Sequence, residues 1–482
     1  MGCGPGIAPR PSRTVSSKGE DMSVAASAAG QEGDDYQLGK IIFASSAGTL
    51  IEWYDFYIFG SLAATVLPPL FFPGDNPVVS VLLTLATFAT GFAVRPFGAA
   101  VFGRIGDTTG RKFTFVLTIS IMGGATFLIG LLPTFETIGV LAPILLVTLR
   151  LLQGLALGGE YGGAAIYVAE HSPDKQRGYY TSYIQTTATI GLFVSLVVVV
   201  GVQLIVGESS FNSWGWRIPF LLSGVLFLIA LYIRLNLQET PLFKRMKDAG
   251  KGSKSPIKDS FKGGAWKLMV LALFGATAGQ AVVWYTGQFY ALFFLQSELG
   301  IPLLNSSIIV GSALVLATPF FLVFGRLSDR IGRKPIILGG CLIAALTYIP
   351  IFQGLTQFAD PLNYPIMIAL VFILVLYVTM VYGPIAAFLV ELFPINVRYT
   401  SLSLPYHIGN GWFGGFTPLI ASSVVAATNS PLAGLAFPIA VALMTVVIGG
   451  LLIKETKDVK IWDESDMAVA EPVARGLRTK GA

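Results

Sequence analysis

The chain has 482 residues, of which 54% are hydrophobic and 12% are charged, and its formal net charge is +5. Soluble domains carry about 25% charged residues, so this composition excludes an ordinary soluble protein and indicates an integral membrane protein. The chain holds only two cysteines and two histidines. These numbers predict no disulfide framework, no metal site and no cofactor.

The hydropathy pattern predicts an all-α fold with twelve transmembrane helices. Residues 1–40 are rich in Gly, Ala and Ser and predict a disordered cytoplasmic tail. We then expect a six-helix bundle at 41–237, a cytoplasmic linker at 238–266, a second six-helix bundle at 267–453 and a cytoplasmic tail at 454–482. Each predicted span contains about 20 apolar residues or more, enough to cross the hydrocarbon core. The spans are expected near 41–72, 78–103, 113–132, 138–169, 180–206, 217–237, 267–297, 304–326, 335–353, 365–392, 401–426 and 432–453.

Two motifs occur once in each half of the chain. The sequence GRIGDTTGRK at 103–112 is repeated as GRLSDRIGRK at 325–334, and EHSPDKQR at 170–177 is matched in its Glu, Pro and Arg by ELFPINVR at 391–398. Both repeats are offset by roughly 220 residues, and self-similarity at a fixed offset is typical of a duplicated architecture. The two predicted bundles are therefore expected to be homologous.

Basic residues predict how the chain is oriented in the membrane. The connections that follow the second, fourth, sixth, eighth and tenth spans contain Lys and Arg, whereas the alternate connections contain none. Positively charged loops stay cytoplasmic during insertion, so both termini and the linker at 238–266 are expected to face the cytoplasm from a multi-pass protein of the cell membrane. The net positive charge then reflects topology, and we expect no binding of nucleic acid.

Several segments resemble one family of transporters. The duplicated turn motif and the twelve spans resemble the major facilitator superfamily. The stretches GTLIEWYDFYIFG (48–60), FAVRPFGAAVFGRIGDTTGRK (92–112), RLLQGLALGGEYGGAAIYVAE (150–170) and YIQTTATIGLF (183–193) are similar to its metabolite/proton symporter family. The resemblance covers residues 40–456, most strongly in the first half. It implies a monomeric carrier that imports shikimate, 2-oxoglutarate, citrate, or proline and betaine with protons by alternating access.

Acidic side chains within the spans are the candidates for proton coupling. An ionisable side chain there costs about 2.5–3.5 kcal/mol and normally faces a wet cavity or a partner. Glu52 and Asp55 lie on one face of the first span, and Arg150 and Glu160 share a polar stripe of the fourth. We expect Glu52, Asp55 and Glu160 to couple transport to protons. The alternatives are a structural pair between Arg150 and Glu160, and an interfacial or packing role for the acids of the first span.

Arginine, aromatic and amide side chains within the spans are the candidates for substrate binding. The resemblance places Arg95 near the transport path, where a fixed guanidinium can hold a carboxylate through two hydrogen bonds; the alternative is a structural ion pair. In the seventh span, Gln280, Trp284 and Gln288 recur at intervals of four residues, which indicates either cavity lining or packing. The predicted substrate-binding residues are Tyr54, Arg95, Arg150, Gln153, Tyr161, Gln185, Gln280, Trp284, Tyr285 and Gln288.

The resemblance assigns the repeated motifs to a cytoplasmic latch. In the superfamily, the Asp and Arg of the turn motif pair with each other and with the acid that ends the fourth or tenth span, and they stabilise the outward-open state. Topology marking by positive charge would explain the basic residues, but not the acids or the glycines. The predicted latch residues are Gly103, Asp107, Gly110, Arg111, Lys112, Glu170, Arg177, Gly325, Asp329, Gly332, Arg333, Lys334, Glu391 and Arg398.

These observations favour proton-coupled import of a small polar metabolite, with an organic carboxylate preferred because of Arg95 and Arg150. A carrier of a zwitterionic osmolyte such as proline or betaine, and a uniporter without proton coupling, remain as alternatives. A sensor would need a large soluble domain, and an enzyme would need a nucleophile, metal or cofactor motif. The sequence shows neither, so we do not expect an enzyme.

Overall fold

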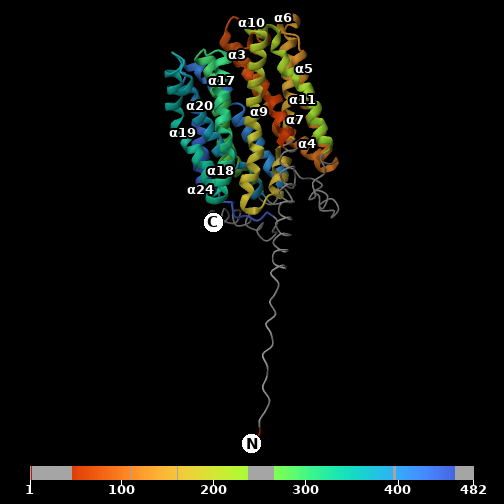
Figure 1. Ribbon diagram of the computed structural model, residues 1–482, viewed down its shortest axis with the longest axis vertical. Helices are drawn as coiled ribbons and strands as arrows, with labels where there is room; N and C mark the ends of the chain where they lie inside the picture. The colour runs from red at the N-terminus through yellow and green to blue at the C-terminus, as the bar shows by residue number, and fades with distance from the viewer. Residues whose placement is uncertain are drawn as a thin grey trace.

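In the part of the chain that it describes, the computed structural model consists of helices joined by short connections. Figure 1 shows the long helices running side by side along one direction, with α19, α20 and α24 towards one edge and α5 and α11 towards the other. The described residues are 2, 46–109, 111–159, 161–236, 265–393 and 398–461.

The first half begins with a helix whose described part covers residues 46–62. The later helices of this half include one sharply bent pair, in which Glu208–Gly215 meets Arg217–Tyr232 at 59°. In chain order they are α2 (Leu67–Phe71), α3 (Pro77–Ala93), α4 (Arg95–Thr109), α5 (Arg111–Leu131), α6 (Phe135–Ile138), α7 (Leu141–Gly158), α8 (Tyr161–His171), η1 (Asp174–Gln176), α9 (Arg177–Val206), α10 (Glu208–Ser210), η2 (Phe211–Gly215) and α11 (Arg217–Asn236).

The second half has the same general order of long helices, but its seventh and eleventh spans alternate between α-helix and the wider π-helix. Such π segments are frequent at functional sites. The helices are α14 (Ala265–Ala272), η3 (Leu273–Thr277), α15 (Ala278–Tyr285), η4 (Thr286–Tyr290), α16 (Ala291–Phe293), η5 (Phe294–Glu298), α17 (Leu303–Ala317), α18 (Pro319–Ile331), α19 (Arg333–Gln357), α20 (Tyr364–Tyr382), α21 (Ile385–Leu392), α22 (Arg398–Ile408), η6 (Gly409–Gly414), α23 (Thr417–Thr428), η7 (Ala433–Leu435) and α24 (Ala436–Leu452).

Eight helices within the described residues are long and apolar enough to cross a membrane, and the bent pair makes a ninth. The helix at 46–62, the apolar helix α5 and the segment from α22 to α23 correspond to the other three predicted spans. The expectation of an all-helical membrane fold is therefore confirmed. The boundaries of the two bundles, and the side of the membrane that each end faces, stay predictions.

Glycines in α7 bring the start of α4 into the middle of the protein. A methyl group on Gly154 would lie 1.8 Å from the carbonyl oxygen of Gly91. One on Gly158 would lie 2.2 Å from the carbonyl oxygen of Arg95. Because glycine alone permits this backbone contact between helices, these positions fix Arg95, the first residue of α4, against α7.

The two halves meet along α9, which packs against α17 and α18, and along α4, which packs against α22. All three contacts join helices of the first half to helices of the second. Figure 1 shows α9 standing between the two outer groups of helices. Side chains at these contacts can therefore respond to any movement of one half against the other.

Candidate functional site

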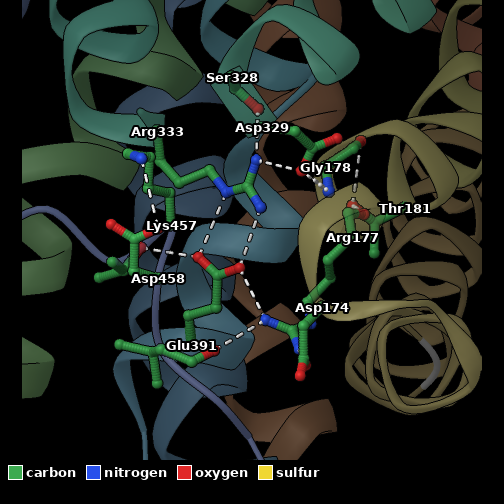
Figure 2. Close-up of polar contacts among 12 residues, drawn as sticks. Asp174, Arg177, Gly178, Thr181, Ser328, Asp329, Arg333, Glu391, Lys457 and Asp458 are labelled. Atoms are coloured by element: carbon green, nitrogen blue, oxygen red, sulfur yellow. Dashed lines mark hydrogen bonds and ion pairs between the residues drawn. The ribbon is translucent and has the colours of Figure 1, made fainter. Parts of the chain in front are cut away.

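Glu391, near the end of α21, is the centre of a buried ion-pair cluster between the halves (Figure 2). Its Oε1 atom accepts hydrogen bonds from Arg177 Nη1 at 2.9 Å and Arg333 Nη2 at 3.0 Å. Its Oε2 atom accepts from Arg333 Nε at 3.3 Å and from the Thr456 hydroxyl at 2.8 Å. Arg177 belongs to the first half and Arg333 to the second, so one carboxylate joins both.

Asp329, at the end of α18, caps a helix of the opposite half. Its two carboxylate oxygens accept hydrogen bonds from the backbone N–H groups of Gly178 and Tyr179, each at 2.8 Å. These donors lie in the first turn of α9, where a negative charge is favourable. Arg333 Nη1 also donates to Asp329 at 2.6 Å. Separation of the halves would therefore remove the cap from α9.

The second repeated motif forms a crossed pair of contacts. Arg177 of the first copy pairs with Glu391 of the second at 2.9 Å. Arg398 of the second copy pairs with Glu170 of the first at 3.5 Å. The structure therefore brings together equivalent residues of the two repeats, and the Arg398 contact is the longer one.

The glycines of the second turn motif have steric roles. Gly332 has φ +116°, a backbone conformation that favours glycine. A methyl group on Gly325 would lie 2.7 Å from the carbonyl oxygen of Gly178, so this glycine lets α18 approach α9. Lys334 Nζ donates at 2.8 Å to the carbonyl oxygens of Gly450 and Ile453.

The chain after α24 returns to the same cluster. The Glu455 carboxylate accepts from the backbone N–H groups of Arg333 at 2.8 Å and Lys334 at 3.1 Å. The carbonyl oxygen of Val459 accepts from Arg177 Nη1 at 3.2 Å, and Ile461 is 1% exposed. This segment contacts both halves.

A second polar cluster lies in the interior, around Arg95. This side chain is fully buried, and none of its three guanidinium nitrogens has a hydrogen-bond partner within the described residues. Its guanidinium carbon lies 5.5 Å from the ring centroid of Trp53 and 5.7 Å from that of Phe92, within the range of a cation–π contact. Arg95 is thus a desolvated cation whose nitrogens make no well-formed hydrogen bond within the described residues, although its side chain interacts with that of Tyr285.

His407 of α22 is the matching group from the second half. It is fully buried, and neither ring nitrogen has a hydrogen-bond partner within the described residues. Its ring packs against Tyr406 at a centroid distance of 5.3 Å. His407 is not among the predicted substrate-binding residues, although a histidine within a span is by itself a signal of function.

Tyrosines of both halves meet beside this cluster. Tyr161 stacks on Tyr406 with ring centroids 3.5 Å apart, and its hydroxyl accepts from Gln185 Nε2 at 2.6 Å. The hydroxyl groups of Tyr382 and Tyr406 lie 2.7 Å apart. Sequence reasoning missed Tyr382 and Tyr406, because aromatic residues in a span are usually packing residues.

The predicted residues of the seventh span are all buried. The side-chain amides of Gln280 and Asn410 exchange hydrogen bonds at 3.3 and 3.2 Å. Gln288 Nε2 donates to Thr189 of the first half at 3.2 Å. The structure brings Trp284 and Tyr285 within 4.8 Å of each other, measured between ring centroids.

Arg150, unlike Arg95, is held by contacts within the first half. It donates to Gln153 Oε1 at 2.8 Å and to the carbonyl oxygens of Phe56 and Phe88 at 3.2 and 3.4 Å. Gln153 in turn donates to Thr126 at 2.7 Å. These contacts favour a structural role for Arg150.

The acids of the first helix are buried, with Glu52 2% exposed and Asp55 1% exposed. Asp55 interacts with the hydroxyl group of Ser223 on α11. The Tyr54 hydroxyl donates to the carbonyl oxygen of Pro219, also on α11, at 3.0 Å. Asp55 and Tyr54 therefore face α11, within the first half.

Some predicted residues cannot be placed. Glu160 and Gly110 lie outside the described residues, as do the side chains of Asp107, Arg111 and Lys112 and the surroundings of Gly103. The described residues contain no group of His, Cys, Asp and Glu that could hold a metal ion.

The fold and the two interfacial clusters define a multi-pass membrane transporter of the major facilitator type. Residues 40–463 match the family described as sugar (and other) transporter. The chain belongs to this family, and it is therefore a transporter of small molecules and not an enzyme.

Among its relatives, the chain is 36% identical to the proline/betaine transporter of Escherichia coli (strain K12) over 433 residues, 88% of this chain and 85% of that protein. It is 35% identical to the shikimate transporter of the same strain, over 80% of this chain and 87% of that protein. The alpha-ketoglutarate permease is 34% identical, over 80% and 86%. A solved structure of the xylose transporter XylE from E. coli shares the fold, with a TM-score of 0.68 and 18% identity over 87% of this chain and 98% of that one.

Proposed function

We propose that the protein is a secondary active transporter that imports a small metabolite carrying a carboxylate, together with protons, by alternating access. The observation that carries the proposal is Arg95, a buried guanidinium with unpaired donors between the two halves. A buried unpaired cation is unfavourable, and a carboxylate is the group that best complements it.

The cluster around Glu391 supports alternating access. It joins the halves at the end predicted to be cytoplasmic, so passage from the interior to that end requires Arg177 and Arg398 to leave their partners. The predicted orientation has both termini in the cytoplasm. Under this proposal, Lys175, which is exposed beside the cluster, is inaccessible from outside intact cells. Labelling of a cysteine at this position by an impermeant reagent would contradict the orientation.

Buried acids support proton coupling. Glu52 and Asp55 are almost fully excluded from solvent, and an acid that alternates between a closed and an open environment can take up and release a proton. The proposal adds Glu160 because it lies in the polar stripe of the fourth span. These acids need not touch the substrate, because exchange of protons and of substrate can be coupled through movement of the helices.

A zwitterionic osmolyte is the second candidate substrate. The protein named as a proline/betaine transporter is 36% identical over 88% of this chain, and the rings of Trp53 and Phe92 lie against Arg95. Such a substrate also carries a carboxylate, so the role of Arg95 is the same in both cases. The third possibility, a uniporter, differs in having no dependence on protons.

Purified protein in liposomes with an inward proton gradient tests proton coupling. We expect accumulation of a transported carboxylate against its gradient, and loss of accumulation on addition of a protonophore. Among Glu52→Gln, Asp55→Asn and Glu160→Gln, at least one variant should still exchange substrate but no longer concentrate it, since exchange needs no net proton movement.

Asp75→Asn is the matched control, because Asp75 is an exposed acid outside the helices and should leave accumulation unchanged. If the unmodified protein exchanges a solute but never accumulates it under a proton gradient, the protein is a uniporter and the three carboxylates have no coupling role.

A further inference from the structure

The surroundings of Arg95 and His407 show that these side chains approach one region from opposite halves. α4, which begins with Arg95, packs against α22, which carries His407. The indole N–H of Trp412 donates to the carbonyl oxygen of Ala93 at 3.0 Å. A methyl group on Gly411 would lie 2.6 Å from the carbonyl oxygen of Phe92. The chain just after His407 is therefore fixed against the chain just before Arg95.

Local sequence explains why His407 is held in this place. Pro405 lies inside α22, and its carbonyl oxygen accepts from the Thr277 hydroxyl at 2.9 Å. Two glycines of the π segment η6 then allow close contact with the seventh span. Methyl groups on Gly409 and Gly414 would lie 2.7 Å from Thr277 and 2.5 Å from Tyr285. The eleventh span can thus bring a histidine to the interface with little freedom to move.

We propose that Arg95 and His407 together bind a single carboxylate of the transported ligand, which then bridges the two halves, and that the ligand is a monocarboxylate. This inference rests on the proposed function. Arg95 supplies the charge and two donors, and one ring nitrogen of His407 supplies a further N–H donor. Both side chains are fully buried and have no hydrogen-bond partner within the described residues, so the carboxylate would satisfy donors that are otherwise unmet.

The other buried arginines already have partners, and this explains why the ligand should carry only one carboxylate. Arg150 is occupied by Gln153 and two backbone carbonyl groups, and Arg177, Arg333 and Arg398 are paired with carboxylates. Within the described residues, Arg95 is the only buried arginine with no hydrogen-bonded nitrogen. A second carboxylate on the ligand would be desolvated without a cation to pair with.

Aromatic rings indicate what the rest of the ligand is. Tyr57 lies between Trp53, at a centroid distance of 5.0 Å, and Trp284, at 5.5 Å. Tyr285 also contacts Trp284, at a centroid distance of 4.8 Å. Flat faces of this kind suit an apolar ring or an alkylated ammonium group, and this group of rings contains no cation to pair with a second anion.

Equilibrium binding to the purified protein in detergent tests this inference without requiring transport. The probes are proline, glycine betaine and shikimate as monocarboxylates, and alpha-ketoglutarate as the dicarboxylate. Prolinamide and choline are the matched analogues that lack the carboxylate. We expect at least one monocarboxylate to bind, its analogue without the carboxylate to bind about 100-fold more weakly, and alpha-ketoglutarate to bind at least tenfold more weakly than that monocarboxylate.

Variants separate the two contacts. Arg95→Lys should weaken binding of the monocarboxylate about 30-fold or more, because lysine cannot donate two parallel bonds. His407→Leu should weaken it about tenfold, whereas His407→Gln, which keeps a donor, should stay within about threefold of the unmodified protein. His171→Gln, a change in the exposed histidine, is the control and should bind normally. A thermal melt of each variant confirms that it is folded.

Three results of the binding experiments would overturn the inference. These are unaltered binding by folded His407→Leu, binding of alpha-ketoglutarate as tight as that of any monocarboxylate, and no binding of any of the three monocarboxylates. Transport in liposomes distinguishes the two proposals. A dicarboxylate that is accumulated under a proton gradient would support the proposed function and refute the single-carboxylate site. Binding as expected, with no proton-driven accumulation, would refute proton coupling and leave the site in place.

Discussion

The clusters around Glu391 and Arg95 are both buried between the halves. The arginines of the first have a carboxylate partner, whereas Arg95 has none within the described residues. Around Glu391, guanidinium groups from both halves reach one carboxylate, so the cost of removing these charges from water is offset by their contacts. Around Arg95, a guanidinium that is equally excluded from water has no hydrogen-bond partner within the described residues. The first arrangement stabilises one conformation. The second leaves a binding capacity that a ligand can fill.

Neutralising Glu391 should change the stability of the protein most, because it removes the carboxylate that both arginines of this cluster contact. Glu391→Gln leaves Arg177 and Arg333 without their shared charge, and loss of one partner of a buried pair costs about 3 kcal/mol. We expect a lower melting temperature of the purified protein and a population shift towards the state in which this end is open. The shift is measured by thiol labelling of Ser182→Cys, because Ser182 is buried where α9 meets α18.

Asp458→Asn is the control for Glu391→Gln, since Asp458 pairs with Lys457 at the surface and such pairs contribute little. If Glu391→Gln has the melting temperature and labelling rate of this control, the cluster does not hold the two halves together.

Removing the charge of Arg95 should change the stability of the protein in the opposite direction. Arg95→Gln deletes a buried charge without a hydrogen-bond partner, so we expect the ligand-free protein to gain about 2 kcal/mol of stability while uptake is lost. Arg150→Gln is the matched comparison. It should lower the melting temperature, because the carbonyl oxygens of Phe56 and Phe88 lose a donor. Equal destabilisation by both changes would show that Arg95 is as well paired as Arg150.

The Glu170–Arg398 contact, which is equivalent to Glu391–Arg177 in the other repeat, should show the smallest effect on stability. Glu170 meets Arg398 at 3.5 Å, compared with 2.9 Å between Glu391 and Arg177. Glu170→Gln should therefore destabilise the protein by about 1 kcal/mol, less than Glu391→Gln does. Melting curves of the two single variants and the double variant measure the difference. If Glu170→Gln destabilises the protein more than Glu391→Gln does, the longer Glu170–Arg398 contact contributes more to stability than the shorter Glu391–Arg177 contact.

The sequence predicted the fold and part of the interface, because both depend on repeated local patterns. Apolar length identified the spans, and the offset repeat identified Glu170, Arg177, Glu391 and Arg398 as a set. The pattern could not show that each arginine reaches the other repeat's acid. That pairing depends on how the two halves pack.

The interior site was harder to predict for a physical reason. Arg95 and Arg150 look alike in sequence, as single arginines in apolar surroundings. They differ in their contacts with other helices, because the carbonyl oxygens of Phe56 and Phe88 reach Arg150. His407 could have been recognised from its position within a span, but its relation to Arg95 depends on the contact between α22 and α4.

The segment that follows α24 has a practical consequence for reporter fusions. Glu455, Thr456 and Val459 bond to Arg333, Glu391 and Arg177, so a fluorescent protein fused directly after Leu452 would replace part of the closed end of the molecule. A reporter attached beyond Ile461 leaves these bonds in place. The fusion after Leu452 would then favour the conformation in which this end is open, even where the amount of protein in the membrane, measured by fluorescence, is normal.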